Sequence, residues 1–308
     1  MNTSQATVLF VDDEERILRS LRMLFRGRCQ VLATTSGREA LEFVRRQPVH
    51  VVVSDQRMPE MVGVELLRGV REASPATMRL LLTGYSDLPA IVASVNDGEI
   101  FRFVEKPWQP QYLIETVEQA AEIALAEFAA RSQASAAPPM PAGAMILVVD
   151  EDPETARLVR ELSPESHEVR RAESVESALS ILSEHDVAVV VAELKYRQDD
   201  MAGVLKTLKR HNPATLAIAV SALRDSRSLI DLINQGQIFR FLPKPLSREL
   251  LRRSLSSGLD RHARTRAAPV LLRRHAVEEP KFEAVSLSAR FMEYWRRIRD
   301  NGRARQSS

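Results

Sequence analysis

The fold is decided by the stretch Val51-Val52-Val53-Ser54-Asp55-Gln56-Arg57-Met58-Pro59. Its apolar, β-branched first half is typical of a buried central strand, which we expect over residues 49–54. One carboxylate, that of Asp55, follows directly. In an open parallel sheet, side chains just beyond the carboxyl end of a strand lie in the crevice where ligands bind. Asp55 is therefore well placed to take part in chemistry and poorly placed for burial.

Strand and helix patterns alternate on both sides of this stretch. We expect further strands over residues 7–11, 31–34, 79–83 and 102–104, and helices over 17–25, 36–44, 64–73, 88–96 and 112–131. Ser36 is the expected N-cap of the second helix, and Glu39 stands at its capping-box position. Parallel strands need helical crossovers on both faces of a sheet. These five βα units therefore predict a doubly wound α/β domain with a five-stranded parallel sheet.

The second part of the chain repeats the first at an offset of 138 residues. Asn96–Phe103 returns as Asn234–Phe241, and Val8–Asp12 matches Ile146–Asp150. Self-similarity at this distance indicates a duplicated domain. Gly63 pairs with Gly203 at an offset of 140, so the loop after the third strand is two residues longer in the second copy.

This repeat predicts four segments. A first domain covers residues 1–128, and an Ala/Ser/Pro-rich linker covers 129–144. A second domain covers 145–260, with its last helix over 248–259, and a basic tail, partly helical or disordered, covers 261–308. The tail holds twelve Lys/Arg and five Asp/Glu, a charge of +7 in a chain whose net charge is +2.

Composition narrows the class of protein. The chain contains no apolar run of the length that a membrane span needs, and its first residues do not resemble a secretion signal. The single cysteine, Cys29, excludes an intramolecular disulfide and any multi-cysteine metal site within one chain. We therefore expect a cytoplasmic protein.

Five polar side chains fall at the predicted strand ends: Asp12, Asp13, Asp55, Thr83 and Lys106. Three crowded carboxylates repel one another unless a cation neutralises them. Because the ligands are oxygen only, the expected cation is Mg²⁺ with several waters. A lysine and a hydroxyl facing this site suit an incoming phosphoryl group, which Asp55 would attack in line.

This combination, together with Met58-Pro59, Gly63, Gly84 and Pro107, resembles the receiver domain of two-component response regulators over residues 6–128. The resemblance implies a CheY-like, flavodoxin-like fold in which Asp55 is the phosphoacceptor. Asp12, Asp13, Asp55 and the backbone carbonyl of Arg57 would hold Mg²⁺, and Lys106 and Thr83 would contact the phosphoryl oxygens. The implied partner is a histidine kinase or phosphotransfer protein. The implied catalysis is limited to Mg²⁺-dependent self-phosphorylation and self-dephosphorylation at Asp55.

A phosphoryl group adds negative charge and acceptor oxygens, so it can bias a two-state element. By resemblance, Thr83 and the aromatic Phe103 would form this switch. An ordinary core phenylalanine is an equal alternative for Phe103.

The second copy keeps two carboxylates, a hydroxyl and an ammonium in Asp150, Glu151, Ser221 and Lys244, but Glu193 replaces the acceptor aspartate. Glutamate is one methylene longer, which misplaces an in-line attack. It can instead reach Lys244 and form a standing ion pair. We expect a degenerate receiver that is not phosphorylated, either fixed in one signalling state or serving as a scaffold.

The tail shows one basic amphipathic helix, with Phe291, Met292, Trp295 and Ile298 on one face. We find no output-domain motif, so signalling by protein contact is the leading hypothesis. A DNA-binding regulator that uses the basic tail is the alternative, with nucleic acid a less favoured partner. A phosphohydrolase with an aspartyl nucleophile is a third hypothesis, and a homodimer is compatible with the sequence.

Overall fold

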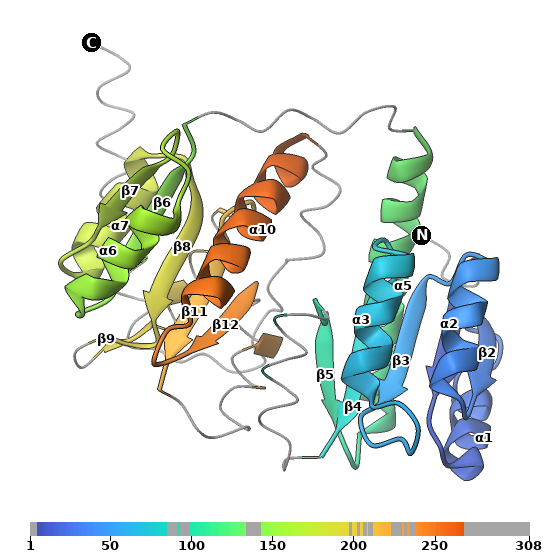
Figure 1. Cartoon of the computed structure of the whole chain (residues 1–308). Coiled ribbons are helices and arrows are strands. Elements are labelled where there is room, and N and C mark those ends of the chain that lie inside the picture. Colours follow the sequence, from blue (N-terminus) through green and yellow to red (C-terminus); the bar gives the residue numbers. More distant parts are fainter. Residues whose placement is uncertain are drawn as a thin grey trace. The chain divides into compact units, whose positions relative to one another are not determined.

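The computed structural model describes residues 5–84, 99–133, 143–196, 199–201, 212–222 and 238–267, and single positions between 92 and 234. The described residues do not include Gly203, the predicted helix in the tail, or most of the predicted helix over 88–96. The chain forms two compact units, each with one five-stranded sheet (Figure 1).

The first sheet is parallel and has the strand order β2-β1-β3-β4-β5. Its strands are β1 (Thr7–Val11), β2 (Gln30–Thr34), β3 (Val51–Asp55), β4 (Met78–Thr83) and β5 (Arg102–Glu105). Every residue of β1, β3 and β4 is buried, as expected for strands covered on both faces. The prediction of a doubly wound parallel sheet is confirmed.

Helices cover both faces of this sheet: α1 (Glu15–Leu24), α2 (Gly37–Arg46), α3 (Gly63–Ala73) and α5 (Pro110–Gln133). The apolar faces of α1 and α5 pack with β1, β3 and β4 into one core. In Figure 1, α2 and α3 lie side by side against the sheet. The last five residues of α5 extend into the segment predicted as a linker.

The second sheet has the same topology, with the order β12-β11-β8-β6-β7. Its strands are β6 (Met145–Val149), β7 (Glu168–Arg171), β8 (Val187–Glu193), β11 (Leu216–Ser221) and β12 (Arg240–Pro243). The described helices of this unit are α6 (Pro153–Leu162), α7 (Val175–Glu184) and α10 (Arg248–Ala267). The apolar faces of α6 and α10 pack against the sheet in one core. The predicted duplication is therefore a duplication of structure.

Two features of this unit differ from the sequence prediction. The loop after β8 contains a short antiparallel pair, β9 (Lys195–Tyr196) with β10 (Asp199–Asp200), where the second copy is two residues longer. The prediction that the last helix ends at residue 259 is wrong, because α10 continues to Ala267. His262 and Thr265 are buried on this extension, so packing sustains a helix whose composition is strongly basic. No helix in the described part of the chain is long and apolar enough to cross a membrane.

Candidate functional site

Asp55 is the last residue of β3, and the sheet carries it to the carboxyl edge beside Leu82 of β4. It is buried, with 6% of its surface exposed. Its Oδ2 accepts the backbone N–H of Arg57 at 3.0 Å, which holds the carboxylate at the start of the following loop. The expectation that Asp55 is poorly placed for burial is therefore wrong. The loop and its neighbours cover it, and a paired carboxylate can be buried.

Lys106 joins Asp55 to the carboxylate at the end of β1. Its Nζ lies 2.6 Å from Asp55 Oδ1 and 2.9 Å from Asp12 Oδ2. The other oxygen of Asp12 accepts the backbone N–H of Glu14 at 2.9 Å. Burial works to lower the pKa of Lys106, but its hydrogen bonds to Asp55 and Asp12 outweigh burial and raise that pKa. The ammonium is therefore firmly charged and shared between two buried carboxylates.

The remaining acidic residue, Asp13, is exposed next to this pair. In the described part of the chain, no group of three or more Asp, Glu, His or Cys side chains has the spacing of a preformed metal site. Mg²⁺ binds through one or two carboxylates and keeps several waters. The oxygen-only donor set of Asp12, Asp13 and Asp55 fits that chemistry, and the carbonyl of Arg57 stays a predicted ligand.

Thr83 ends β4 and is buried. Its hydroxyl donates to the carbonyl of Gly84 at 3.0 Å, and its own carbonyl accepts the backbone N–H of Lys106 at 3.0 Å. The ends of β4 and β5 therefore meet directly beside the carboxylates. Phe103 is buried on β5, two residues along the strand from Glu105, which pairs with Thr83. Its predicted role as a switch stays a prediction.

Gly63 begins α3 and makes room for the loop after Asp55. Its backbone N–H donates to the carbonyl of Gln56 at 3.0 Å. A Cβ at this position would overlap the carbonyl oxygen of Asp55 and lie 2.8 Å from Leu81 Cδ1. The loop can close over the end of β3 only because residue 63 has no side chain.

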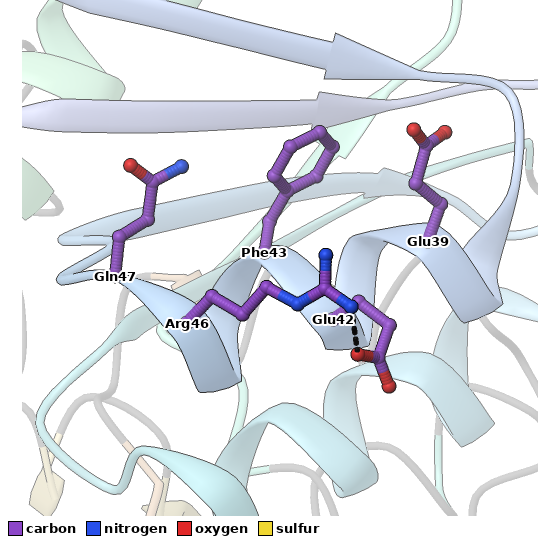
Figure 2. A pocket seen from close by; sticks show the side chains of 5 residues that line it. All are labelled: Glu39, Glu42, Phe43, Arg46 and Gln47. Carbon is purple, nitrogen blue, oxygen red and sulfur yellow. Dashed lines mark ion pairs between the residues drawn. The ribbon is translucent and has the colours of Figure 1, made fainter.

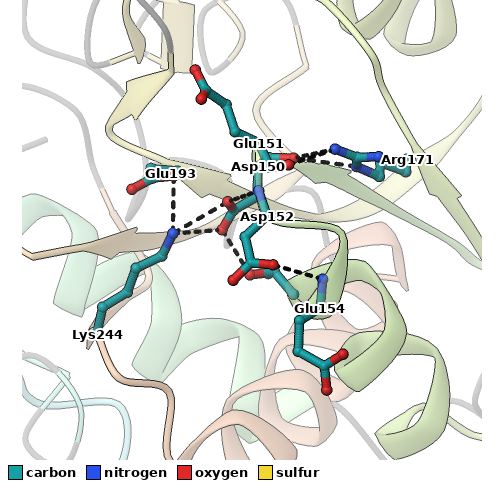
Figure 3. Close-up of polar contacts among 8 residues, drawn as sticks. Asp150, Glu151, Asp152, Glu154, Arg171, Glu193 and Lys244 are labelled. Atoms are coloured by element: carbon teal, nitrogen blue, oxygen red, sulfur yellow. Dashed lines mark hydrogen bonds and ion pairs between the residues drawn. The ribbon is translucent and has the colours of Figure 1, made fainter.

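The second unit has a matching cluster of charged side chains. We call the cluster of Asp12, Asp13, Asp55 and Lys106 the first pocket, and that of Asp150, Glu151, Glu193 and Lys244 the second pocket. Lys244 Nζ lies 2.9 Å from Glu193 Oε2 and 3.2 Å from each oxygen of Asp150, so the predicted Glu193–Lys244 ion pair is confirmed (Figure 3). Burial raises the pKa of Glu193, Lys244 works against that rise, and nearby Asp150 adds to it. Ser221 is buried at the end of β11, and its carbonyl accepts the backbone N–H of Lys244 at 2.9 Å.

Two residues of this second pocket had not been singled out in the sequence. The Thr155 hydroxyl donates to Asp150 Oδ2 at 2.8 Å. Arg171 donates to the backbone carbonyl of Asp150 at 3.2 Å and to that of Glu151 at 2.8 Å. The positions 138 residues earlier hold Ile17 and Ala33, so a comparison of the two copies shows that both residues differ but not what they contact.

A surface hollow of about 320 Å³ lies on α2, apart from the carboxylate pockets (Figure 2). It is lined by Glu39, Glu42, Phe43, Arg46 and Gln47. Its ion pair, between Arg46 and Glu42 at 3.2 Å, joins neighbouring turns on the exposed face of α2. We assign it no chemical role.

Comparison with known proteins identifies the same domain twice. The family profile described as the response regulator receiver domain matches residues 8–118 and 146–256. Over 122 residues the chain is 46% identical to the hydrogenase transcriptional regulatory protein HoxA of Cupriavidus necator, which covers 40% of this chain and 25% of that protein. Over 117 residues it is 37% identical to the transcriptional regulatory protein FixJ of Rhizobium meliloti, covering 38% of this chain and 57% of FixJ.

Among solved structures, the signal receiver domain of an HD domain-containing protein from Pseudomonas fluorescens is 32% identical, with a TM-score of 0.39. It covers 42% of this chain and 95% of that domain. The chain thus spans about a quarter of the length of HoxA and about half of FixJ.

Proposed function

Since the chain belongs to the response regulator receiver family, which its two matched segments make up, we propose that its first domain accepts a phosphoryl group on Asp55. The donor would be a histidine kinase or a phosphotransfer protein. The observation that carries this proposal is the Lys106 ammonium held 2.6 Å from Asp55 and 2.9 Å from Asp12. An ammonium in this position can stabilise the negative charge of the Asp55 carboxylate before transfer and that of the phosphoryl oxygens after it.

The transfer forms a bond between an Asp55 carboxylate oxygen and phosphorus, and it breaks the phosphorus–nitrogen bond of a phosphohistidine. The departing imidazole nitrogen takes a proton from water. Lys106 neutralises the transferred oxygens, and the Thr83 hydroxyl gives up its bond to Gly84 to donate to one of them. Mg²⁺, when held by Asp12, Asp13, Asp55 and the Arg57 carbonyl, would supply the remaining positive charge. We propose no catalysis beyond this self-phosphorylation and the hydrolysis of the resulting acyl phosphate.

The second domain, in this proposal, takes no phosphoryl group. Glutamate is one methylene longer than aspartate, which misplaces its carboxylate for an in-line attack, and Glu193 keeps that carboxylate paired with Lys244 at 2.9 Å. The domain then acts as a fixed-state module or a scaffold, and the chain signals through protein contacts.

Labelling with acetyl phosphate tests the acceptor. Wild type and the Glu193→Ala variant should take up one equivalent of acid-stable, base-labile label, and Asp55→Ala should take up none. Label that persists in Asp55→Ala and disappears in Glu193→Ala would place the acceptor in the second domain.

A DNA-binding output is a second candidate, because HoxA and FixJ are both named transcriptional regulators. Residues after Ala267 carry most of the basic tail. A truncation should therefore begin at residue 268, since an earlier cut would remove part of α10. DNA binding that weakens steeply with salt in the full chain and is lost in this truncation would support the candidate. Equal binding by both would contradict it.

A further inference from the structure

The two pockets differ in more than the acceptor. In the first, Asp12 receives a hydrogen bond from the backbone and an ion pair from Lys106. In the second, Asp150 has the equivalent backbone bond and lysine, and it also accepts the buried Thr155 hydroxyl at 2.8 Å. The residue in the place of Thr155 in the first unit is Ile17, which has no donor.

Arg171 is the second difference. It ends β7 and pairs with Val148 in the sheet, as Ala33 pairs with Phe10 in the first unit. Its guanidinium donates to the carbonyls of Asp150 and Glu151, so it fixes the loop that carries both acidic residues. Figure 3 shows the Glu151 carboxylate pointing away from the Lys244 ammonium.

Arg171 makes the formal charge of the second pocket differ from that of the first. The first pocket has three carboxylates and the Lys106 ammonium, a formal charge of −2 that one divalent cation matches. The second has three carboxylates with Lys244 and Arg171, a formal charge of −1. Arginine stays charged at every pH at which the protein is folded. A divalent cation entering the second pocket would therefore face two fixed cations and an acidic residue turned outward.

We propose that Arg171 and Thr155 hold the second pocket together in place of a divalent cation, so that this pocket excludes metal. The Mg²⁺ site that the family implies thus does not fit the second copy. Arg171 and Thr155 are positioning residues, acting through Asp150 and Glu151. The inference rests on the proposed function only for the comparison with a metal-binding first pocket.

Mn²⁺ added to the whole 308-residue chain tests this, because the paramagnetic ion broadens the amide NMR signals of nearby residues. In wild type, the amides of Asp13 and Arg57 should broaden while those of Glu151 and Leu194 keep their intensity. Signals of the first pair test the proposed function, and signals of the second pair test this inference, so the two can fail separately. Broadening of Glu151 and Leu194 in wild type at the Mn²⁺ concentration that broadens Asp13 would overturn the inference.

The variant Thr155→Ile/Arg171→Ala gives the second unit the residues that the first unit has at these two positions. Removing one nearby positive charge should lower the Mn²⁺ concentration that broadens Glu151 and Leu194 by about tenfold or more. Arg170→Ala is the matched control, because Arg170 contacts Glu168 at 2.5 Å and His185 at 2.7 Å instead of the pocket. This control should behave as wild type.

Unchanged chemical shifts in β6 and β8 will show that the double variant is folded. Should it not fold, Arg171→Gln, which keeps most of the side-chain length, takes its place. A folded variant whose Glu151 and Leu194 signals stay as sharp as in wild type would overturn the assignment to Arg171 and Thr155. Gain of Mn²⁺ in the Arg170→Ala control to the same extent would overturn it as well.

Discussion

Gly63 approaches the carbonyl group of Asp55 so closely that a Cβ on Gly63 would overlap the carbonyl oxygen. The helix that follows β3 is thus in direct contact with the backbone of Asp55. Any group added there must move either α3 or Asp55.

We predict that Gly63→Ala destabilises the first unit by about 1–3 kcal/mol, the usual cost of overpacking, and slows labelling of Asp55 by acetyl phosphate. Urea unfolding and the rate of label uptake measure the two effects. Gly69→Ala is the matched control in the same helix, since its Cβ would meet only the flexible side chain of Leu41. A Gly63→Ala protein that labels as fast as Gly69→Ala would show that this contact does not position Asp55.

Replacing Lys106 by Met should destabilise the first unit by roughly 1–3 kcal/mol, because Asp12 and Asp55 would stay buried without a counter-charge. The value lies below that for a fully buried pair, since 29% of the Lys106 side chain is exposed. Mg²⁺ should recover part of the loss by binding only the folded state.

Urea unfolding with and without Mg²⁺ checks this prediction. The control is Arg28→Met, which breaks the exposed Arg28–Glu118 pair and should cost less than about 1 kcal/mol, with no recovery by Mg²⁺. Equal losses in the two variants would mean that Lys106 is not needed to neutralise the buried carboxylates.

His50 should make the first unit sensitive to acid. Its Nδ1 accepts the backbone N–H of Thr7 at 3.0 Å, its ring lies against Phe128, and burial lowers its pKa below 6.5. The unfolded chain therefore binds the proton more readily than the folded one. The contribution of His50 is fully present above pH 6.5, and it is lost as the pH falls from there through the lower pKa of the folded state.

Unfolding of wild type and His50→Gln at pH 7.5 and 5.5 measures this contribution. The variant should lose less stability between the two pH values, although it is less stable than wild type at pH 7.5. An identical loss in both proteins would show that His50 does not titrate differently on folding.

Glu193→Gln should not destabilise the second unit at pH 7. The pKa of Glu193 is raised by burial and by Asp150 even though Lys244 is adjacent, so its ionised form is disfavoured in the folded state. That penalty acts above the folded-state pKa and disappears as the pH falls through it towards 4.5. The advantage of the glutamine variant should shrink over the same range.

Lys244→Met is the contrasting variant, because it leaves the fully buried Asp150 without its ammonium and should destabilise the unit. Unfolding at pH 7 and pH 4.5 compares the variants. A Glu193→Gln protein as unstable at pH 7 as Lys244→Met would mean that the ion pair of Glu193 outweighs its burial.

Local pattern predicted most of the helices and strands, and the start of α2 shows where local pattern falls short. Ser36 caps α2, as expected, and accepts the N–H of Glu39 at 3.4 Å. The Glu39 carboxylate, however, accepts from the Thr34 hydroxyl, and that hydroxyl accepts the N–H of Ser36 at 3.0 Å. The capping box therefore runs through a residue of β2, which spacing within the helix does not reveal.

Buried arginines were also beyond prediction. Arg102 is fully buried and stacks 4.3 Å from the ring centre of Phe101, and Arg240 repeats this 4.0 Å from Phe239. Each also donates to the carbonyl of that phenylalanine. Sequence statistics place arginine at the surface. The ring and carbonyl that compensate for burial belong to the preceding residue, but the burial itself depends on the tertiary packing of the strand.

Some residues of the candidate sites could be predicted from the sequence, and others could not. Topology alone brings the strand-end residues Asp12, Asp55 and Lys106 together, so their proximity could be predicted. Arg171 and Thr155 could not be predicted from their own surroundings, because a threonine in a first helical turn and an arginine on an edge strand have no distinctive pattern. Their contacts depend on the path of the β6–α6 loop.

In both copies the lysine makes two contacts. Its ammonium pairs with the carboxylate that ends the central strand, Asp55 or Glu193. Its backbone N–H donates to the carbonyl of the residue that ends the neighbouring strand, Thr83 or Ser221. A change of charge at the carboxylate therefore reaches the junction of two strands through one residue. Only the first copy can undergo that change in the proposed mechanism. A partner that binds both junctions would therefore contact one junction that changes on phosphorylation and one that does not.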